Sequence, residues 1–252
     1  MTRVMVTLDV EGDDGTSSLR GLDDLPRLLD GLESRKIPAT LFVVGELARR
    51  RPEAIRALSD RGHEVASHSM THAPLGRCDV AQRRAELRDS KAALEDATGR
   101  PCVGFRAPFF DLPRGMGHEL SDAGYRWSSS KAPFSPVAGY RHLLATNRGP
   151  HALDGSAVTE LPVPRMFGLP IPEGLSYRRL FWPVSALAAA PPSVFYLHPY
   201  EVLRPEGSAL PRHLRPFIEF RRGPWAEDLL WRTLDGWRDR GARFVTAAEA
   251  LA

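Results

Sequence analysis

Two histidines that lie four residues apart have the spacing of a pair that can share one divalent metal ion. In the segment His68-Ser-Met-Thr-His72, positions i and i+4 fall on one face of a helical turn. The spacing alone is a weak signal. Hydrolytic zinc sites commonly combine three protein ligands with one position for water, and two histidines plus one carboxylate fit that pattern. A neighbouring carboxylate would therefore make this pair a candidate catalytic metal site.

Two carboxylates, Asp9 and Glu11, follow the first β-type run of the chain. Because they are two residues apart, one can bind a metal while the other stays available as a base. Taken alone, the run DVEGDD is also what an acidic turn after a strand looks like. Arg106 and His198 each end another β-type run, so four separate segments carry ionisable residues at equivalent positions.

The alternation of short and long patterns predicts the elements that position these residues. Short β-type runs predict strands at 3–9, 39–44, 63–67, 102–106, 125–129, 157–163, 193–198 and 242–246. Helical spacing of apolar residues and helix-end signals predict helices at 19–36, 52–61, 79–98, 115–123, 177–189 and 225–240. The stretch from 130 to 175 is otherwise expected to be mostly loop.

Strands that alternate with helices over the whole chain predict an α/β fold. We expect about seven parallel strands that are closed or nearly closed into a barrel, in a single domain spanning residues 1–252. An open doubly wound sheet is the alternative. The four ionisable segments would then meet at the carboxyl-terminal rim, where such barrels assemble active sites. The first strand is followed by neither of the glycine-rich motifs that bind dinucleotides or nucleoside triphosphates.

Composition narrows the function classes. A chain of 252 residues with 42% hydrophobic and 26% charged residues is neither disordered nor a coiled coil nor a disulfide-stapled miniprotein. The formal net charge is +3, but bases and acids alternate, as in RRAELRDSK at 83–91, which we interpret as a solvated helix face rather than a nucleic-acid site. Cys78 and Cys102 are expected to be free thiols. Without an apolar span or a signal pattern, the chain is expected to be cytoplasmic.

Four segments resemble the successive motifs of a known family. They are TLDVE at 7–11, SHSMTH at 67–72, FRAPFF at 105–110 and YLHPYE at 196–201. Together they resemble the polysaccharide deacetylases, the NodB-homology group or carbohydrate esterase family 4, over about residues 3–200. The resemblance implies a distorted TIM-like (β/α) barrel. It also implies removal of N-acetyl groups from sugars with a divalent metal, most often Zn²⁺, with Co²⁺, Ni²⁺ or Mn²⁺ as further candidates.

The resemblance implies a role for each motif residue on the metal and base side of the site. His68 and His72 would bind the metal, Asp9 would be the catalytic base, and Arg106 would orient that base. The common first motif is T-F-D-D, with its second aspartate on the metal, whereas this chain has valine there. A subgroup has an acid two positions after the base, so Glu11 is the expected third ligand. VTELPVPR at 158–165 resembles the same subgroup.

Other motif residues would contact the substrate. The resemblance implies that the backbone N–H of Phe109 helps to hold the oxyanion, with Pro108 beside it, and that Leu197 lines the pocket for the acyl methyl group. His198 would be the general acid, and Glu201 is a candidate partner for its ring. Asp13 remains the alternative third metal ligand.

We therefore expect a metal-dependent N-deacetylase acting on a small amino sugar or a glycoconjugate. A deformylase or an allantoinase-like cyclic amide hydrolase is the enzyme alternative, and the size of the acyl pocket would discriminate them. A non-catalytic glycan-binding barrel is the third hypothesis, although such a module needs neither a base nor an acid. No nucleic-acid partner is expected. Arginines around the mouth would favour a phosphate-bearing substrate.

Overall fold

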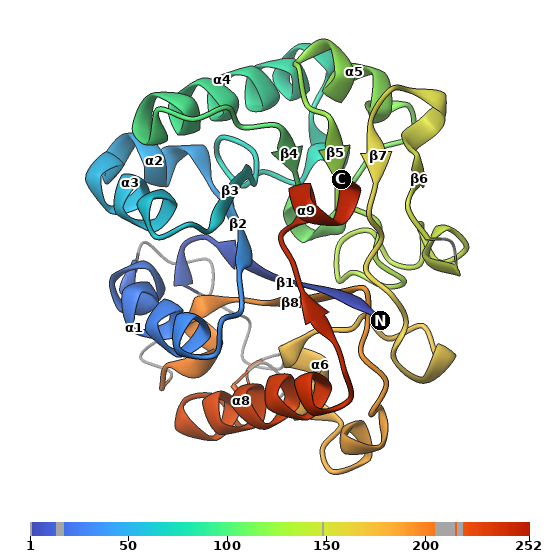
Figure 1. Cartoon of the computed structure of the whole chain (residues 1–252). Helices are drawn as coiled ribbons and strands as arrows, with labels where there is room; N and C mark the ends of the chain where they lie inside the picture. Colours follow the sequence, from blue (N-terminus) through green and yellow to red (C-terminus); the bar gives the residue numbers. More distant parts are fainter. Residues whose placement is uncertain (1, 14–17, 148, 205–214, 216–218) are drawn as a thin grey trace. The chain divides into compact units, whose positions relative to one another are not determined.

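The computed structural model describes residues 2–13, 18–147, 149–204, 215 and 219–252. The chain forms two compact units (Figure 1). The first unit comprises residues 1–39 and 173–252, and the second comprises residues 40–172. Each unit contains its own strands and helices.

The first unit is organised around one buried strand. β1 (Arg3–Val10) pairs in parallel with β8 (Val194–Leu197) and, at its start, with β9 (Arg243–Phe244). From its second residue onward β1 is buried, as expected for a parallel strand that is covered on both faces. The register aligns Leu8 with Leu197, the last residue of β8, so the last two residues of β1 extend beyond this pair. Asp9 and His198 therefore lie at the same edge of the sheet.

Four helices accompany these strands in the described part of the first unit. They are α1 (Arg20–Ser34), α6 (Leu175–Leu180), α8 (Pro224–Asp239) and α9 (Ala247–Leu251). The leucines of α1 that recur at helical spacing are all buried. An ion pair of 2.5 Å between Arg27 and Glu227 connects α1 to α8.

The second unit is a mostly parallel sheet. Its strands are β2 (Ala39–Val43), β3 (Glu64–Ser67), β4 (Gly104–Phe105), β5 (Trp127–Ser128), β6 (His151–Ala152) and β7 (Thr159–Glu160). They lie in the order β2-β3-β4-β5-β7-β6, as Figure 1 shows, and the β7–β6 pair alone is antiparallel among these described strands. Because β2, β3, β4 and β5 are parallel, the loops that follow them leave from one edge.

Four helices complete the second unit, namely α2 (Gly45–Arg50), α3 (Pro52–Asp60), α4 (Val80–Thr98) and α5 (Met116–Asp122). The long helix α4 packs on α2, α3 and β3 (Figure 1). Its N-terminus has the predicted cap, because the Asp79 carboxylate accepts from the Gln82 N–H at 2.8 Å. Its C-terminus ends at Gly99, whose φ of 69° is the left-handed conformation that glycine adopts without strain.

The structure differs from the predicted elements in several places. The strands expected at 102–106, 125–129 and 242–246 are each only two residues long, as β4, β5 and β9. The single helix expected at 177–189 is instead α6 followed by a 3₁₀ turn, Val184–Leu187, because Pro183 lacks the N–H that would continue the helix. The strand expected at 157–163 is only β7, and prolines at 162 and 164 limit its ladder. Three elements, α2, β6 and α9, were not expected, since each is too short to show a periodicity.

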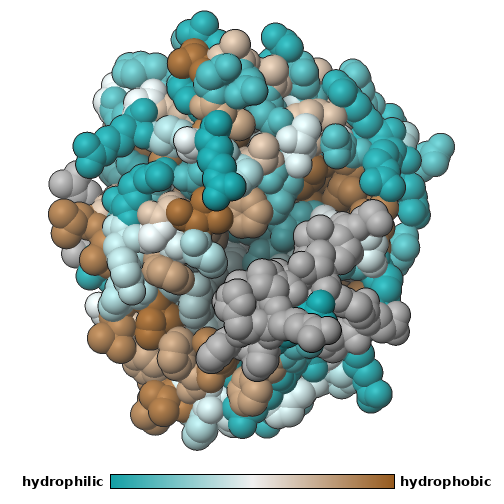
Figure 2. Space-filling model, turned by 180° about the vertical axis from the view of Figure 1, so that it is seen from behind, coloured by the Kyte–Doolittle hydropathy of each residue, from teal (hydrophilic) through white to brown (hydrophobic). Residues whose placement is uncertain are grey.

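The surface carries both hydrophilic and hydrophobic side chains, whereas most large apolar side chains are buried in the core. Hydrophilic side chains cover much of the upper part of the face in Figure 2, and hydrophobic ones gather at its lower left. Within the described residues, no helix is both long and apolar enough to cross a membrane. Cys78 and Cys102 are free thiols, as predicted, and Cys102 is buried.

Candidate active site

The second unit places the two motif histidines side by side after β3. The His68 side chain is buried, and its Nδ1 atom lies 2.8 Å from the carbonyl oxygen of Arg106. Since a carbonyl can only accept, Nδ1 must carry the proton, and the lone pair is then on Nε2. The ring of His72 lies 5.0 Å from that of His68, centroid to centroid. This tautomer and this neighbour are what a metal-binding histidine pair requires.

The segment that carries these histidines is not the helical turn predicted from their spacing. Ser69 and His72 have φ values of 63° and 62°, in the left-handed region, so the chain loops after β3. Glu86 of α4 holds the loop: its carboxylate accepts from the Met70 and Thr71 N–H groups at 2.8 and 2.9 Å. The Thr71 hydroxyl donates to the same carboxylate at 2.6 Å. The i, i+4 spacing thus brings the rings together through a loop, not through a helix.

Glu86 was missed because it belongs to the segment interpreted as a solvated helix face. That interpretation is wrong for two of its residues. Glu86 fixes the histidine loop, and Arg83 forms a largely buried ion pair of 2.7 Å with Glu119 of α5. Neither contact has a signal in the sequence, because both depend on partners from other elements.

Arg106, which follows β4, is completely buried. Its Nε atom donates to the Ser129 carbonyl at 2.9 Å, and a terminal nitrogen donates to the Ser129 hydroxyl at 2.9 Å. The guanidinium carbon lies 4.0 Å from the centre of the Phe42 ring, a cation–π contact. These contacts fix both the side chain and the carbonyl that orients His68.

The FRAPFF motif ends in a tight 3₁₀ turn, Pro108–Phe110, in which Phe109 has a φ of 56°. The N–H groups of Phe110 and of the next residue, Asp111, donate to Ala107 and Pro108 carbonyls at 3.0 and 2.9 Å. Within the described part of the chain, the Phe109 N–H has no acceptor. The Phe109 ring lies 4.7 Å from the ring of His72. An unused amide beside a candidate metal ligand is suited to holding an oxyanion.

In the first unit, His198 faces the carboxylates that end β1. Its Nε2 atom lies 4.0 Å from Asp9 and 3.9 Å from Glu11. Asp9 is buried, and Glu11 is half-buried and accepts from the Tyr200 hydroxyl at 3.5 Å. The Tyr200 ring stacks on the imidazole at 4.9 Å. One imidazole is therefore held between a phenol ring and two acids.

Glu201 holds the other side of the His198 ring. Its carboxylate lies 3.6 Å from Nδ1 and accepts from the His198 N–H at 3.0 Å, while Ser176 and Arg179 donate to its second oxygen. Burial alone would lower the pKa of His198, but the Glu201 carboxylate and the two nearby acids raise it to about 9. Burial alone would raise the pKa of Glu201, but its contacts with His198 and Arg179 lower it to about 2. The imidazole is therefore protonated at neutral pH.

Asp13, the alternative ligand to Glu11, forms hydrogen bonds at the start of α1. Its carboxylate accepts from the Gly21 N–H at 3.0 Å and from the Ser18 hydroxyl at 2.7 Å, at the start of α1. An acidic group there satisfies the exposed amides of the helix N-terminus. Leu197, the last residue of β8, is buried.

A known family matches the part of the chain that carries the first three of the four motifs. Residues 6–128 match the model of the polysaccharide deacetylase family. This segment is therefore similar to the polysaccharide deacetylases. Asp9, His68, His72 and Arg106 lie inside this stretch, whereas His198 lies beyond it.

The chain also resembles individual proteins. A chitooligosaccharide deacetylase from a Bradyrhizobium species is 42% identical over 72 residues, which are 29% of this chain and 33% of that relative. The chain thus spans about a third of the relative's length.

Similarity to solved structures extends over nearly the whole chain. A Mycobacterium smegmatis structure named as a polysaccharide deacetylase is 21% identical, with a TM-score of 0.66 over 99% of this chain and 88% of that one. An allantoinase structure is 16% identical, with a TM-score of 0.62 over 98% and 88%. These likenesses confirm the predicted fold class, the distorted (β/α) barrel of the polysaccharide deacetylases. They do not distinguish deacetylation of a sugar from hydrolysis of a cyclic amide, because one fold can host several activities.

Proposed function

We propose that the chain is a metal-dependent hydrolase that removes the N-acetyl group from an N-acetylated amino sugar or glycoconjugate. The observation that carries this proposal is the 2.8 Å contact between His68 Nδ1 and the Arg106 carbonyl, next to the His72 ring. A histidine bound to a metal almost always donates its other nitrogen to such an oxygen. The contact lies within the segment that matches the deacetylase family.

His68, His72 and Glu11 would hold the ion, with Zn²⁺ as the first choice because two imidazoles and one carboxylate suit it. Glu11 is preferred to Asp13 because the Asp13 carboxylate is committed to the start of α1. This choice corresponds to the proposed subgroup with the D-x-E first motif. When bound, such an ion lowers the pKa of a water molecule toward 7 and polarises a carbonyl.

Asp9 would accept the proton of the attacking water, and Arg106 would orient that carboxylate. The oxyanion that forms on the amide carbon would accept from the Phe109 N–H, which has no acceptor of its own among the described residues. Loss of one such donor typically costs about 2.7–4 kcal/mol of transition-state stabilisation.

An amine is a poor leaving group, so it must be protonated as the C–N bond breaks. His198 would donate this proton from Nε2, while Glu201 holds the ring from its Nδ1 side. A positioned general acid contributes about 10²–10⁴-fold to the rate. Leu197 and Pro108 would line the space for the acyl methyl group.

The test is acetate release from N-acetylglucosamine, chitooligosaccharides and peptidoglycan fragments by protein loaded with Zn²⁺. We expect turnover of at least one of them and none of it after His68→Ala. Allantoin and N-formylglucosamine belong in the same panel, because cyclic amide hydrolysis and deformylation are the alternative activities on this fold. Turnover of allantoin alone would replace the proposed activity, and inertness toward every compound would favour a non-catalytic glycan-binding role.

A further inference from the structure

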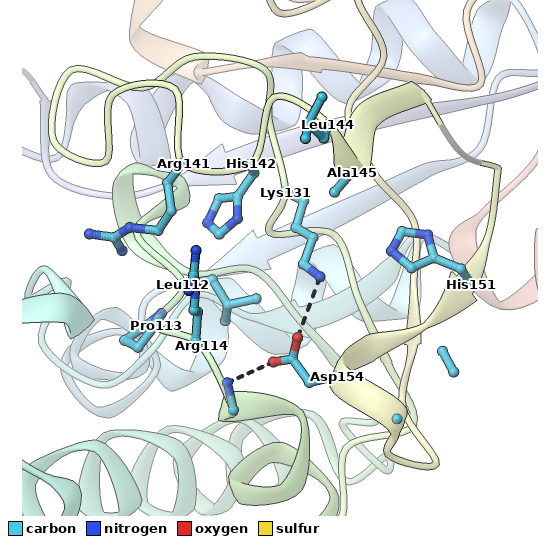
Figure 3. Close-up of a pocket in the computed structure, with 13 residues that line it drawn as sticks. Leu112, Pro113, Arg114, Lys131, Arg141, His142, Leu144, Ala145, His151 and Asp154 are labelled. Carbon is cyan, nitrogen blue, oxygen red and sulfur yellow. Dashed lines mark hydrogen bonds and ion pairs between the residues drawn. The ribbon is translucent and has the colours of Figure 1, made fainter.

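A cavity of about 580 Å³ lies within the second unit (Figure 3). Three segments of the chain bring cations to it, namely Arg114, Lys131 and Arg141, whereas Asp154 is the one carboxylate among its described lining residues. A cavity of this size accepts a sugar-sized ligand. Its charge makes it a candidate for an anionic group.

Lys131 is the first sign of an anion site, because its described ion pair, with Asp154, is too long to include a hydrogen bond. Its side chain is only 12% exposed, and the paired carboxylate oxygen is 3.7 Å from the ammonium. Among the described residues the ammonium donates to no acceptor. A largely buried charge without hydrogen bonds is costly, and a bound anion would remove that cost.

His142 is the second sign. The residue is 8% exposed, and its Nε2 atom has no hydrogen-bond partner in the part of the chain that the structure describes. Figure 3 shows its ring between Arg141 and Lys131. Burial and the charges of these two neighbours lower the pKa of His142 to about 4, so the ring is neutral at pH 7. A neutral imidazole there can still donate one hydrogen bond to an anion.

The cavity is lined by the same chain segment that carries the candidate oxyanion donor, the Phe109 N–H. Leu112, which lines it, follows Phe109 by three residues, so the two Cα atoms are at most about 11 Å apart. Arg141 is tied to this segment by a 2.5 Å ion pair with Asp111. Asp111 in turn accepts from the Gly76 N–H at 2.8 Å, just beyond the histidine loop. A ligand of sugar size could therefore reach from the Phe109 amide into the cavity.

We propose that this cavity binds a phosphate group of the substrate, which would make the substrate class a phosphorylated N-acetyl amino sugar. The sugar part of this inference rests on the proposed function, whereas the anion site rests on the cavity itself. A tetrahedral phosphate has acceptor oxygens on all sides and fits donors that come from three segments. A planar carboxylate would be satisfied by a single arginine.

Binding of inorganic phosphate, measured by titration calorimetry, tests the site directly. Lys131→Met and Arg114→Gln should each weaken phosphate binding at least about tenfold, as expected for loss of a charge-assisted hydrogen bond. Arg88→Gln is the matched control, because Arg88 is an exposed arginine of α4 and should bind phosphate like the wild type. Thermal melting of each variant verifies that it is folded.

Kinetics test whether the phosphate belongs to the substrate. We expect kcat/KM to be about tenfold or more higher for N-acetylglucosamine phosphates than for N-acetylglucosamine, through KM, since a remote phosphate contact adds uniform binding energy. Lys131→Met should abolish this preference and leave turnover of the neutral sugar unchanged. Binding to phosphatidate vesicles but not to phosphatidylcholine vesicles, lost in the same variant, would assign the phosphate to a lipid-linked compound.

The outcomes separate the two proposals. Phosphate binding that is lost in Lys131→Met supports the anion site even if no substrate is deacetylated, in which case only the proposed function fails. Deacetylation with equal kcat/KM for phosphorylated and neutral sugars, together with no phosphate binding, overturns the anion site and leaves the proposed function standing. Phosphate binding that neither substitution weakens also overturns it.

Discussion

The Nδ1 atom of His68 lies 2.8 Å from the carbonyl oxygen of Arg106, so the backbone after β4 orients the imidazole that follows β3. Both residues come from motifs, but the contact uses the main chain of Arg106 and not its guanidinium. The guanidinium is engaged with Ser129, which leaves the carbonyl fixed in direction. Positioning of the candidate metal ligand thus depends on the sheet itself.

The carboxylate of Glu86 should control metal affinity without touching the metal. Glu86→Gln weakens its hydrogen bonds to the loop that carries His68 and His72, so we expect Zn²⁺ affinity to fall about 10–100-fold. Competition with a chromophoric chelator measures this. Asp89→Asn is the control, because Asp89 also lies on α4, is partly exposed and is paired only with Arg88 among its described ion-pair partners. Equal affinity in both variants would contradict the positioning role of Glu86.

Glu201→Gln should impair the proposed general acid. Without this negative charge the pKa of His198 falls from about 9, and the ring is less firmly held, so kcat should drop about 10²-fold. The pH–rate profile carries the diagnostic signal: the limb that reports loss of the acid at high pH should move to lower pH. A lower kcat with an unshifted limb would mean that Glu201 is merely structural, through Arg179 and Ser176.

Glu160→Ala should loosen the turn after β5. One carboxylate oxygen accepts from the Ser130 and Lys131 N–H groups at 2.9 and 2.7 Å, and the residue is completely buried. Leaving these two buried amides unpaired should reduce the free energy of unfolding by about 2–5 kcal/mol. Urea denaturation measures the loss. Exposed Glu53 provides the comparison, since Glu53→Ala should change stability by no more than about 0.5 kcal/mol.

His142 should make stability depend on pH. Its pKa is lowered to about 4 in the folded chain, whereas the unfolded chain has the ordinary value near 6.5. The unfolded state therefore binds the proton first as the pH falls, and the stabilisation present above pH 6.5 is lost toward pH 4. Between pH 7.5 and pH 4 the wild type should lose about 3 kcal/mol more than His142→Gln. Parallel urea titrations of the two proteins would refute this assignment if their pH dependence is the same.

Sequence patterns predicted the elements whose residues show a clear periodicity, and the residues at the ends of those elements. The apolar runs of β1 and β8 and the helical stripe of α1 are long enough to show their period, and Asp9 and His198 follow directly from the strand ends. The cap of α4 at Asp79 was also visible, because a capping box is a local signal.

What sequence patterns could not predict depends on contacts between distant segments. Glu86 looks like one more charge on a helix until the fold brings the histidine loop to it. The helical-turn prediction for His68–His72 failed because a spacing of four does not distinguish a helix from a loop with left-handed residues. Asp13 and Glu11 have the same chemistry, and only the position of the α1 N-terminus separates them.

The most direct test of the proposed metal-dependent deacetylation is acetate release from an N-acetylated amino sugar by metal-free protein to which Zn²⁺ is added back. We expect no release without metal, full recovery near one equivalent of Zn²⁺, and no recovery in His68→Ala or His72→Ala that remain folded. Undiminished acetate release by the chelated wild type, or by either folded variant, would contradict the proposed metal dependence.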